Sequence, residues 1–394
     1  MTSLAPKVVS LDEACALVTD GTHYTPTDVG SGIPFLTVKD MAAGSLDFTG
    51  CAFITDTDFQ AARAGNSAPV AGDVLFSKDG TVGKVHVVST DQPFAVLSSI
   101  AILRPSRDVD PGYLAHALRS PSVLAEAVRN KTGSAIRRIV LADLKRLKVP
   151  LPPLAEQRRI AAILDRTDAL RVKRRAALAR LEAVDGAMFS HLFGSLITND
   201  RAWPTDVLSR VCDETNDCPH TTPKWATSGV VCLRTSNLTA GGWNWRDKRF
   251  VTAADYHLRS KRGYLEPGDI VLSREGTVGI AAIVPHGVPM CMGQRLVQVR
   301  PSLATVLPQY LLRYLLDVLA PDRIARTMAG STSKHLNLKD LRALRIPLPP
   351  LSDQQLYSGM ANHLSLIRAA HTASLSRLDA LFASLQRAAF RGEL

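Results

Sequence analysis

PLPPLAEQRRIAAILDRTDAL at residues 150–170 is repeated as PLPPLSDQQLYSGMANHLSLI at residues 347–367, and this repeated stretch decides the fold. The second copy begins 347 − 150 = 197 residues after the first. Both copies continue with a stripe at alternating steps of 4 and 3 residues, which is the heptad pattern of paired helices. One such stripe alone is typical of an ordinary core helix. Two copies with matching phase favour two long helices that pair as an antiparallel coiled coil.

The expected pairing stripes are apolar at their ends and polar or small near the middle. The first stripe consists of Ile163, Thr167, Leu170, Arg174, Ala177, Leu181, Val184 and Met188, and the second of Met360, Leu364, Ile367, His371, Ser374, Leu378, Leu381 and Leu385. As pairing residues we select Ile163, Leu170, Arg174, Leu181 and Met188 in the first helix, and Met360, Ile367, His371, Leu378 and Leu385 in the second. Antiparallel pairing would bring the two middles together as one polar layer, which fixes register at some cost in stability. A helix of about 39 residues is about 58 Å long, which suits a spacer.

The rest of the chain is duplicated at nearly the same offset. GDVLFSKDGTVGKVHVV (72–88) matches GDIVLSREGTVGIAAIV (268–284), and DGTHYTP (20–26) matches DCPHTTP (217–223). A fixed period of this kind indicates a tandem duplication of one unit, a mixed domain followed by a long helix. The predicted boundaries are 1–149 for the first domain, 150–197 for the first helix, 198–346 for the second domain and 347–394 for the second helix.

Local patterns predict an α+β fold for each domain. Residues 33–41 and 74–104 are rich in alternating and β-branched apolar residues, which indicates strands. Residues 111–129 and 308–328 have helical periodicity and begin with proline, which suits a first helical turn. The expected architecture is two tandem mixed domains separated by the two long helices.

Composition favours an anionic partner and an intracellular location. The 394-residue chain has a net charge of +11. Residues 1–197 contain 23 Lys and Arg against 20 Asp and Glu, and residues 198–394 contain 24 against 16, so most of the excess is in the second half. Such a balance suits nucleic acid. The six cysteines form no C-x-x-C pair, so we expect buried or free thiols in a reducing cytoplasm. The sequence shows no signal peptide and no membrane span.

Catalytic motifs are absent from the sequence. It has no G-x-G-x-x-G after a strand, no phosphate-binding G-x-x-x-x-G-K-[ST], no H-E-x-x-H and no recognisable nucleophile–base set. A duplicated basic module on a rigid spacer instead suits a polymer with two half-sites, and DNA is the natural one. Because the two copies have diverged in their polar loops, the two half-sites would differ.

The layout resembles the specificity subunit of a type I restriction–modification system, and the resemblance covers nearly the whole chain. The motifs that carry it are DGTHYTP and DCPHTTP, GDVLFSKDGTVG and GDIVLSREGTVG, the two PLPPL helix entries, and the terminal FRGEL (390–394). Each motif is weak alone, but their order is specific. The resemblance makes the domains two target-recognition domains and the helices two spacers.

The resemblance also implies a non-catalytic chain without a cofactor or metal of its own. It would read a bipartite, asymmetric double-stranded DNA target and recruit two modification subunits, which methylate adenine at N6 with S-adenosylmethionine. Two restriction subunits would add ATP- and Mg²⁺-dependent translocation and cleavage. A modification-only system would need the same chain, so the presence of restriction subunits stays open.

Candidate DNA contacts fall into phosphate contacts and base-edge contacts. For phosphates we select basic residues in or beside glycine-rich loops: Lys78, Lys84, Arg137, Arg138, Arg274, Lys334 and His335. For base edges we select the two duplicated loops and two nearby cations: His23, Tyr24, Thr25, Lys39, His220, Thr221, Thr222 and Arg234. The competing interpretations are solvated surface charges and histidines that fix their own turns. Trp225, Trp243 and Trp245 have no match in the first half and favour a core patch private to the second domain.

Two other classes of function compete with DNA recognition. A structural adaptor could use the two domains to bind proteins, and a hydrolase or nuclease could carry an unrecognised site. DNA binding would weaken steeply with salt, which distinguishes it from the adaptor.

Overall fold

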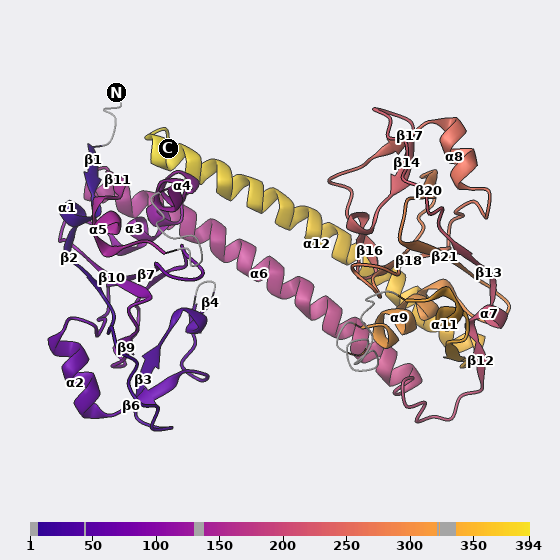
Figure 1. The fold of residues 1–394 in the computed structure, drawn as a ribbon, viewed down its shortest axis with the longest axis horizontal. Helices are drawn as coiled ribbons and strands as arrows, with labels where there is room; N and C mark the ends of the chain where they lie inside the picture. Colours follow the sequence, from indigo (N-terminus) through magenta and orange to yellow (C-terminus); the bar gives the residue numbers. More distant parts are fainter. Residues whose placement is uncertain (1–6, 43–44, 130–137, 321–322, 324–335) are drawn as a thin grey trace. The chain divides into compact units, whose positions relative to one another are not determined.

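The structure is a computed structural model that describes residues 7–42, 45–129, 138–320, 323 and 336–394. The chain divides into two compact units, residues 1–175 with 373–394, and residues 176–372. Each unit contains one α+β domain and parts of both long helices, α6 (Leu154–Phe193) and α12 (Leu351–Arg391) (Figure 1). The 197-residue duplication is therefore visible as two folded domains of one kind.

The central sheet has the same strand order in both domains. Among the described residues, the first is ordered β2-β10-β7-β8 and the second β13-β21-β18-β19, all antiparallel. The strands of the first sheet are β2 (Cys15–Asp20), β7 (Val74–Ser77), β8 (Val85–Val87) and β10 (Ile100–Pro105). Those of the second are β13 (Cys212–Asp217), β18 (Ile270–Ser273), β19 (Ala281–Ile283) and β21 (Leu296–Pro301). Equivalent sequence repeats therefore occupy equivalent strands.

A smaller sheet is also duplicated. In each domain a central strand pairs antiparallel with one neighbour and parallel with the other. The first is β6 (Ala52–Ile54), β3 (Ile33–Leu36) and β9 (Ala95–Val96), followed by helix α2 (Asp56–Ala64) after β6. The second is β17 (Phe250–Val251), β14 (Val230–Leu233) and β20 (Met290–Met292), with helix α8 (Ala253–Arg259).

The remaining elements are short and connect or flank these sheets. Small strand pairs are β1 (Lys7–Ser10) with β11 (Lys148–Leu151), β12 (Thr205–Val207) with β22 (Arg345–Pro347), β4 (Met41–Ala42) with β5 (Ser45–Leu46), and β15 (Leu238–Thr239) with β16 (Gly242–Trp243). The short helices of the first domain are α1 (Leu11–Ala14), η1 (Val38–Asp40), α3 (Pro111–Leu118), α4 (Pro121–Arg129) and α5 (Leu141–Arg146). Those of the second are α7 (Leu208–Val211), η2 (Thr235–Asn237), α9 (Pro308–Val318) and α11 (Leu338–Arg342).

Two expected elements differ from the structure. The helix expected over 111–129 is broken into α3 and α4, because Pro121 cannot continue a helix and disfavours helical backbone before it. The strand expected over 33–41 ends at Leu36 and continues as the short helix η1. The second expected helix, 308–328, is described as α9 up to Val318, and most of its later part lies outside the described residues.

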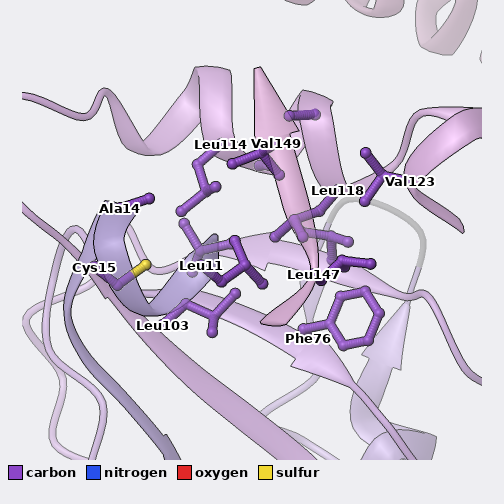
Figure 2. Close-up of a cluster of buried hydrophobic side chains, with 14 of the residues drawn as sticks. Leu11, Ala14, Cys15, Phe76, Leu103, Leu114, Leu118, Val123, Leu147 and Val149 are labelled. Atoms are coloured by element: carbon purple, nitrogen blue, oxygen red, sulfur yellow. The ribbon is translucent and has the colours of Figure 1, made fainter. Parts of the chain in front are cut away.

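Each domain has an apolar core beneath its central sheet. Figure 2 shows Leu11, Phe76, Leu103, Leu114 and Leu147 converging in the first domain, and all five are at most 1% exposed. Full burial of one such side chain contributes about 1.5–3 kcal/mol. The core extends to α6, where residues 160, 161 and 164 are buried against it. The domain and the start of its long helix therefore fold as one body.

The PLPPL entry is where each long helix is fixed to its domain. Gln157 Nε2 donates to the carbonyls of Asp108 and Pro152, while its Oε1 accepts from the Asp110 amide, all at 2.8–2.9 Å. Gln354 makes the equivalent bonds to Thr305, Pro349 and Leu307. Both glutamines are at most 1% exposed. Buried amides need all these partners, so the glutamine of the motif sets the position of the helix.

The two long helices pair antiparallel, as expected. In the first unit Arg159 Nη2 donates to the Leu394 carbonyl at 2.7 Å, and Arg171 Nε donates to Asp379 Oδ1 at 2.6 Å. In the second unit the Tyr357 hydroxyl donates to Asp185 at 3.0 Å, and Arg368 lies 2.9 Å from Glu182. Within each unit, residues that lie later in α6 contact residues that lie earlier in α12, so the two helices run in opposite directions. This confirms the predicted fold class.

The contacting stripe is not identical to the expected one. Leu170 and Ile367 of the expected stripes are 47% and 38% exposed, and Thr167 is buried. Arg171 lies off the expected stripe and is partly buried. The other expected pairing residues are partly buried: Ile163, Arg174, Leu181, Met188, Met360, His371, Leu378 and Leu385. The expected polar layer falls at the boundary between the two units and stays a prediction.

Candidate nucleic-acid interface

The two duplicated loops begin where β2 and β13 end. In the first, His23, Tyr24 and Thr25 are exposed, and the Thr22 hydroxyl donates to the Tyr24 carbonyl at 2.9 Å. In the second, the expected base-contact residues His220, Thr221 and Thr222 are likewise exposed. The structure thus places both sets at the surface, on short loops anchored at the end of a buried strand.

A buried ion pair lies under the first loop. Lys78 Nζ is 3.5 Å from Asp20 Oδ2 and 3.4 Å from Asp79 Oδ2, and the Lys78 side chain is 3% exposed. His23 Nε2 is 3.7 Å from the same Asp20 oxygen. Since Asp20 ends β2 and Lys78 follows β7, the pair joins the base of the loop to the end of β7, on the other side of β10 in the sheet.

The second domain repeats this arrangement. Arg274 Nη2 is 3.4 Å from Asp217 Oδ2 and 3.7 Å from Glu275 Oε1. His220 Nε2 is 3.2 Å from Asp217 Oδ2. We call the two sets the acid–base clusters, and their members are Asp20, His23, Lys78 and Asp79, and Asp217, His220, Arg274 and Glu275. A strand-end carboxylate holding a cation is therefore a property of both domains.

Burial dominates the electrostatics of the first cluster. It raises the pKa of Asp20 above its ordinary value, against the opposing effect of the Lys78 ammonium. Within the described residues, Asp20 Oδ1 and Asp217 Oδ1 are buried without a hydrogen-bond partner. A cavity of about 330 Å³ beside the first loop is lined by residues 19–24 together with Ser67. The cluster can hold the loop in place, and it leaves an acceptor available to a water or a donor group.

Glycines shape the loop that carries Lys78. Gly80 and Gly83 have φ of +66° and +94°, a region that favours glycine. The Ser77 hydroxyl donates to the Thr81 carbonyl at 2.6 Å and accepts from the Lys84 amide at 2.8 Å. Gly276 and Gly279, with φ of +77° and +87°, repeat the turn in the second domain. The repeated S-[KR]-[DE]-G-T-V-G sequence therefore encodes one tight loop.

The expected phosphate contacts are not all presented to solvent. Lys78 and Arg274 point into the acid–base clusters, and Lys84 Nζ donates to the Val38 carbonyl at 2.8 Å. Arg138 is exposed, with its Nε 3.8 Å from Asp79 Oδ1. Phosphate contact by these residues stays a prediction, and for the first two it would require opening an ion pair. Arg137, Lys334 and His335 lie outside the described residues.

The two cations expected to reach bases differ in their surroundings. Lys39 is exposed on η1. Arg234 is partly buried and donates from Nη2 to both the carbonyl and the carboxylate of Asp247. Its guanidinium is therefore already engaged, whereas Lys39 is open to a ligand. Their contact with bases stays a prediction.

The tryptophans separate into two environments. Trp243 and Trp245 stack with ring centroids 5.1 Å apart and pack against the core of the second domain. This confirms the private core patch for these two. Trp225 is 40% exposed, and the Arg249 guanidinium lies 5.3 Å from its ring centroid. Arg249 is not among the candidate DNA contacts selected above, although the unmatched basic run at 246–249 is a signal for it.

The cysteines agree with the expected buried or free thiols. All six cysteines are buried and free. The described residues hold no group of His, Cys, Asp and Glu suited to a metal ion, and none of their helices is long and apolar enough to cross a membrane. The thiols therefore act as core residues.

Comparison with known proteins decides the family. The model of the type I restriction modification DNA specificity domain matches residues 7–182 and again residues 214–368. The chain belongs to the type I restriction–modification specificity family. Each match contains one acid–base cluster and its loops, so the two domains of this specificity subunit are its target-recognition domains.

Curated relatives and a solved structure agree with this assignment, since each is described as a specificity subunit. The chain is 20% identical to the EcoBI specificity subunit of Escherichia coli, over 98% of this chain and 85% of the relative. It is 22% identical to a putative MjaX specificity subunit of Methanocaldococcus jannaschii, over 82% and 78%. The type I S subunit of M. genitalium has the same fold, with a TM-score of 0.57 and 17% identity over 99% and 97%. Specificity subunits are not the catalytic chains, which confirms the prediction that this chain is not an enzyme.

Proposed function

We propose that this specificity subunit reads a bipartite, asymmetric DNA target, with one half-site bound by each domain. The observation that carries the proposal is the duplicated site: an equivalent acid–base cluster supports two loops of different exposed sequence. A shared framework gives both domains one way of approaching a duplex. Different side chains at His23-Tyr24-Thr25 and His220-Thr221-Thr222 would read different base edges.

The long helices would join the two readers and set the number of unspecified base pairs between the half-sites. Helix α6 has 40 residues and α12 has 41, which is about 60 Å each at 1.5 Å per residue. Each is fixed to a domain by a buried glutamine, so the helix and its domain turn together. This arrangement supports a spacer with a defined length and phase.

The same proposal covers the partners and their cofactors. Two modification subunits would bind the helices and nearby faces, and would use S-adenosylmethionine to methylate adenine at N6 on each strand. Two restriction subunits would supply ATP- and Mg²⁺-dependent cleavage where the system includes them. This chain would bind none of these cofactors. The two-headed protein adaptor has no observation in its favour once the DNA specificity domains are assigned.

Alanine substitutions in each loop test the proposal. The complex of this chain with its modification subunits is incubated with a random-sequence duplex library, and methylated adenines are mapped. We expect a split motif. The variant His23→Ala/Tyr24→Ala should relax only one half, and His220→Ala/Thr221→Ala only the other. A motif that is not split, or two loop variants that alter the same half, would contradict the proposal.

A further inference from the structure

Two equivalent segments, one in each domain, carry opposite net charge. Residues 20–66 and 217–263 are equivalent at the 197-residue offset and include the reading loop and two strands of the smaller sheet, β3 and β6 in the first domain and β14 and β17 in the second. The first segment contains 2 Lys and Arg against 6 Asp, a net charge of 2 − 6 = −4. The second contains 8 against 3, a net charge of 8 − 3 = +5. The two domains share one architecture, but the second segment attracts a polyanion electrostatically and the first repels it.

Most of the second segment's cations are exposed. Two are already engaged: Arg234 by Asp247, and Arg259, which is 7% exposed and donates to the carbonyls of Met292 and Thr221. The six exposed ones, which we call the basic surface, are Lys224, Arg246, Lys248, Arg249, Lys261 and Arg262. Arg234 and Arg259 therefore support the fold, and the basic surface is exposed to a ligand.

Local contacts gather the basic surface beside the second reading loop. The bridge between Ala226 and Phe250 places Lys224 near Arg249, whose guanidinium lies over Trp225. Arg262 Nη1 is 3.3 Å from the Cys218 carbonyl, inside the loop itself. Stacking on an indole ring holds a guanidinium in place without neutralising its charge. Charges from three separate segments thus border one loop.

The first domain has no equivalent of this surface at the matching positions. The strand registers Val231↔Phe250 and Pro34↔Phe53 confirm the offset of 197 in the structure. Uncharged residues stand where the basic surface has cations: Thr27, Thr49, Cys51, Ala52, Ala64 and Gly65. Asp56 at the start of α2 adds negative charge where the second domain has Ala253. The asymmetry therefore comes from substitution on a common framework.

We infer that the basic surface of the second domain binds the phosphate backbone of duplex DNA and supplies most of the salt-dependent part of DNA binding. This inference rests on the proposed function and goes beyond it by making the two half-sites electrostatically unequal. The ligand is duplex DNA because the surface borders the loop that would read bases, and phosphates flank every base edge. The first half-site would be held by contacts that depend less on salt.

The test measures the salt dependence of DNA affinity, with the full chain and a duplex of scrambled sequence. The triple variant Lys224→Gln/Arg249→Gln/Lys261→Gln is compared with Arg158→Gln/Arg166→Gln/Lys173→Gln, which removes the same charge from exposed positions of α6. Each lost phosphate contact lowers the slope of log affinity against log salt by about 0.9. We expect the first variant to lose about 2.7 of slope and the control less than about 1.

The outcomes separate the inference from the proposed function. A wild-type slope in the first variant, or equal losses in both, would overturn the inference and leave DNA recognition standing. A wild-type chain without salt-dependent DNA binding would overturn both. An unchanged DNA slope with loss of copurifying modification subunits would assign the surface to a protein partner. Matching circular dichroism spectra would show that both variants fold.

Discussion

Lys78 and Asp20 form an ion pair at 3.5 Å in which both side chains are more than nine-tenths buried. The pair joins the ends of β2 and β7 directly under the loop at residues 21–26. Its counterpart, Arg274 with Asp217 at 3.4 Å, stands at the same place in the second domain. A charge buried in this way is stable only with its partner, so each pair makes the loop position depend on a distant strand.

Loss of Lys78 should destabilise the first domain strongly. Lys78→Met leaves the Asp20 carboxylate buried without its cation, and we expect the free energy of unfolding to fall by about 3 kcal/mol. Urea unfolding measures this change. Lys39→Met, at an exposed position, should change stability by less than about 0.5 kcal/mol. Equal effects of the two substitutions would contradict a buried structural pair.

The buried glutamine of the helix entry should be as sensitive. Gln157→Leu leaves the Asp110 amide and the Asp108 and Pro152 carbonyls without their side-chain partner. We expect a loss of about 2–4 kcal/mol, because each buried unsatisfied group costs about 1–3 kcal/mol. Gln354→Leu should act alike in the second unit, and exposed Gln355→Leu is the matched control. Urea unfolding that is unchanged in Gln157→Leu would refute this anchoring role.

His116 should make the first unit sensitive to acid. It is 1% exposed with its Nε2 2.7 Å from Asp165 Oδ1, and burial lowers its pKa below 6.5 in spite of that carboxylate. In the unfolded chain the His116 imidazole binds a proton near pH 6.5, whereas in the folded chain it binds that proton only at a lower pH. Stability present above pH 6.5 is therefore lost as the pH falls.

The variant His116→Gln should lose less stability than the wild type between pH 7.5 and 5.5, as measured by urea unfolding at both values. Its counterpart in the second domain is Arg313, which keeps its charge across this range. An equal acid loss in the variant and the wild type would show that other groups are responsible.

Arg171 should contribute to helix pairing through its planar shape as well as its charge. Its guanidinium donates to Asp379 at 2.6 Å and lies 4.4 Å from the Phe382 ring centroid. Arg171→Lys keeps the charge but loses the stacking, so we expect a loss of about 1–2 kcal/mol. Arg175→Lys, at a position that is half exposed, should lose less than about 0.5 kcal/mol. Thermal unfolding in which Arg175→Lys is the more harmful would contradict this ranking.

The sequence predicted the duplication, the long helices and their antiparallel pairing, because each leaves a periodic signal. It did not locate the contacting stripe well. Gln157 and Arg171 are buried or partly buried because they have polar partners, and a search for apolar positions passes over them. Leu170, which fits the apolar pattern, is exposed.

The candidate site shows the same limit. Lys78 and Arg274 follow the sequence pattern of a cationic loop, but their partners Asp20 and Asp217 come from distant strands. Only the sheet order β2-β10-β7 brings those strand ends together. Exposed loop residues such as His23 and His220 could be selected from the repeat alone, since a loop next to a proline is expected at the surface.

We propose that this chain specifies a split DNA target for adenine methylation. A map of N6-methyladenine across the genome of the source cell, with this gene intact and deleted, tests it most directly. We expect deletion to remove one motif, made of two short half-sites around an unspecified gap with one methylated adenine on each strand. An identical map in both strains, when the chain is expressed and bound to its modification subunits, would contradict it.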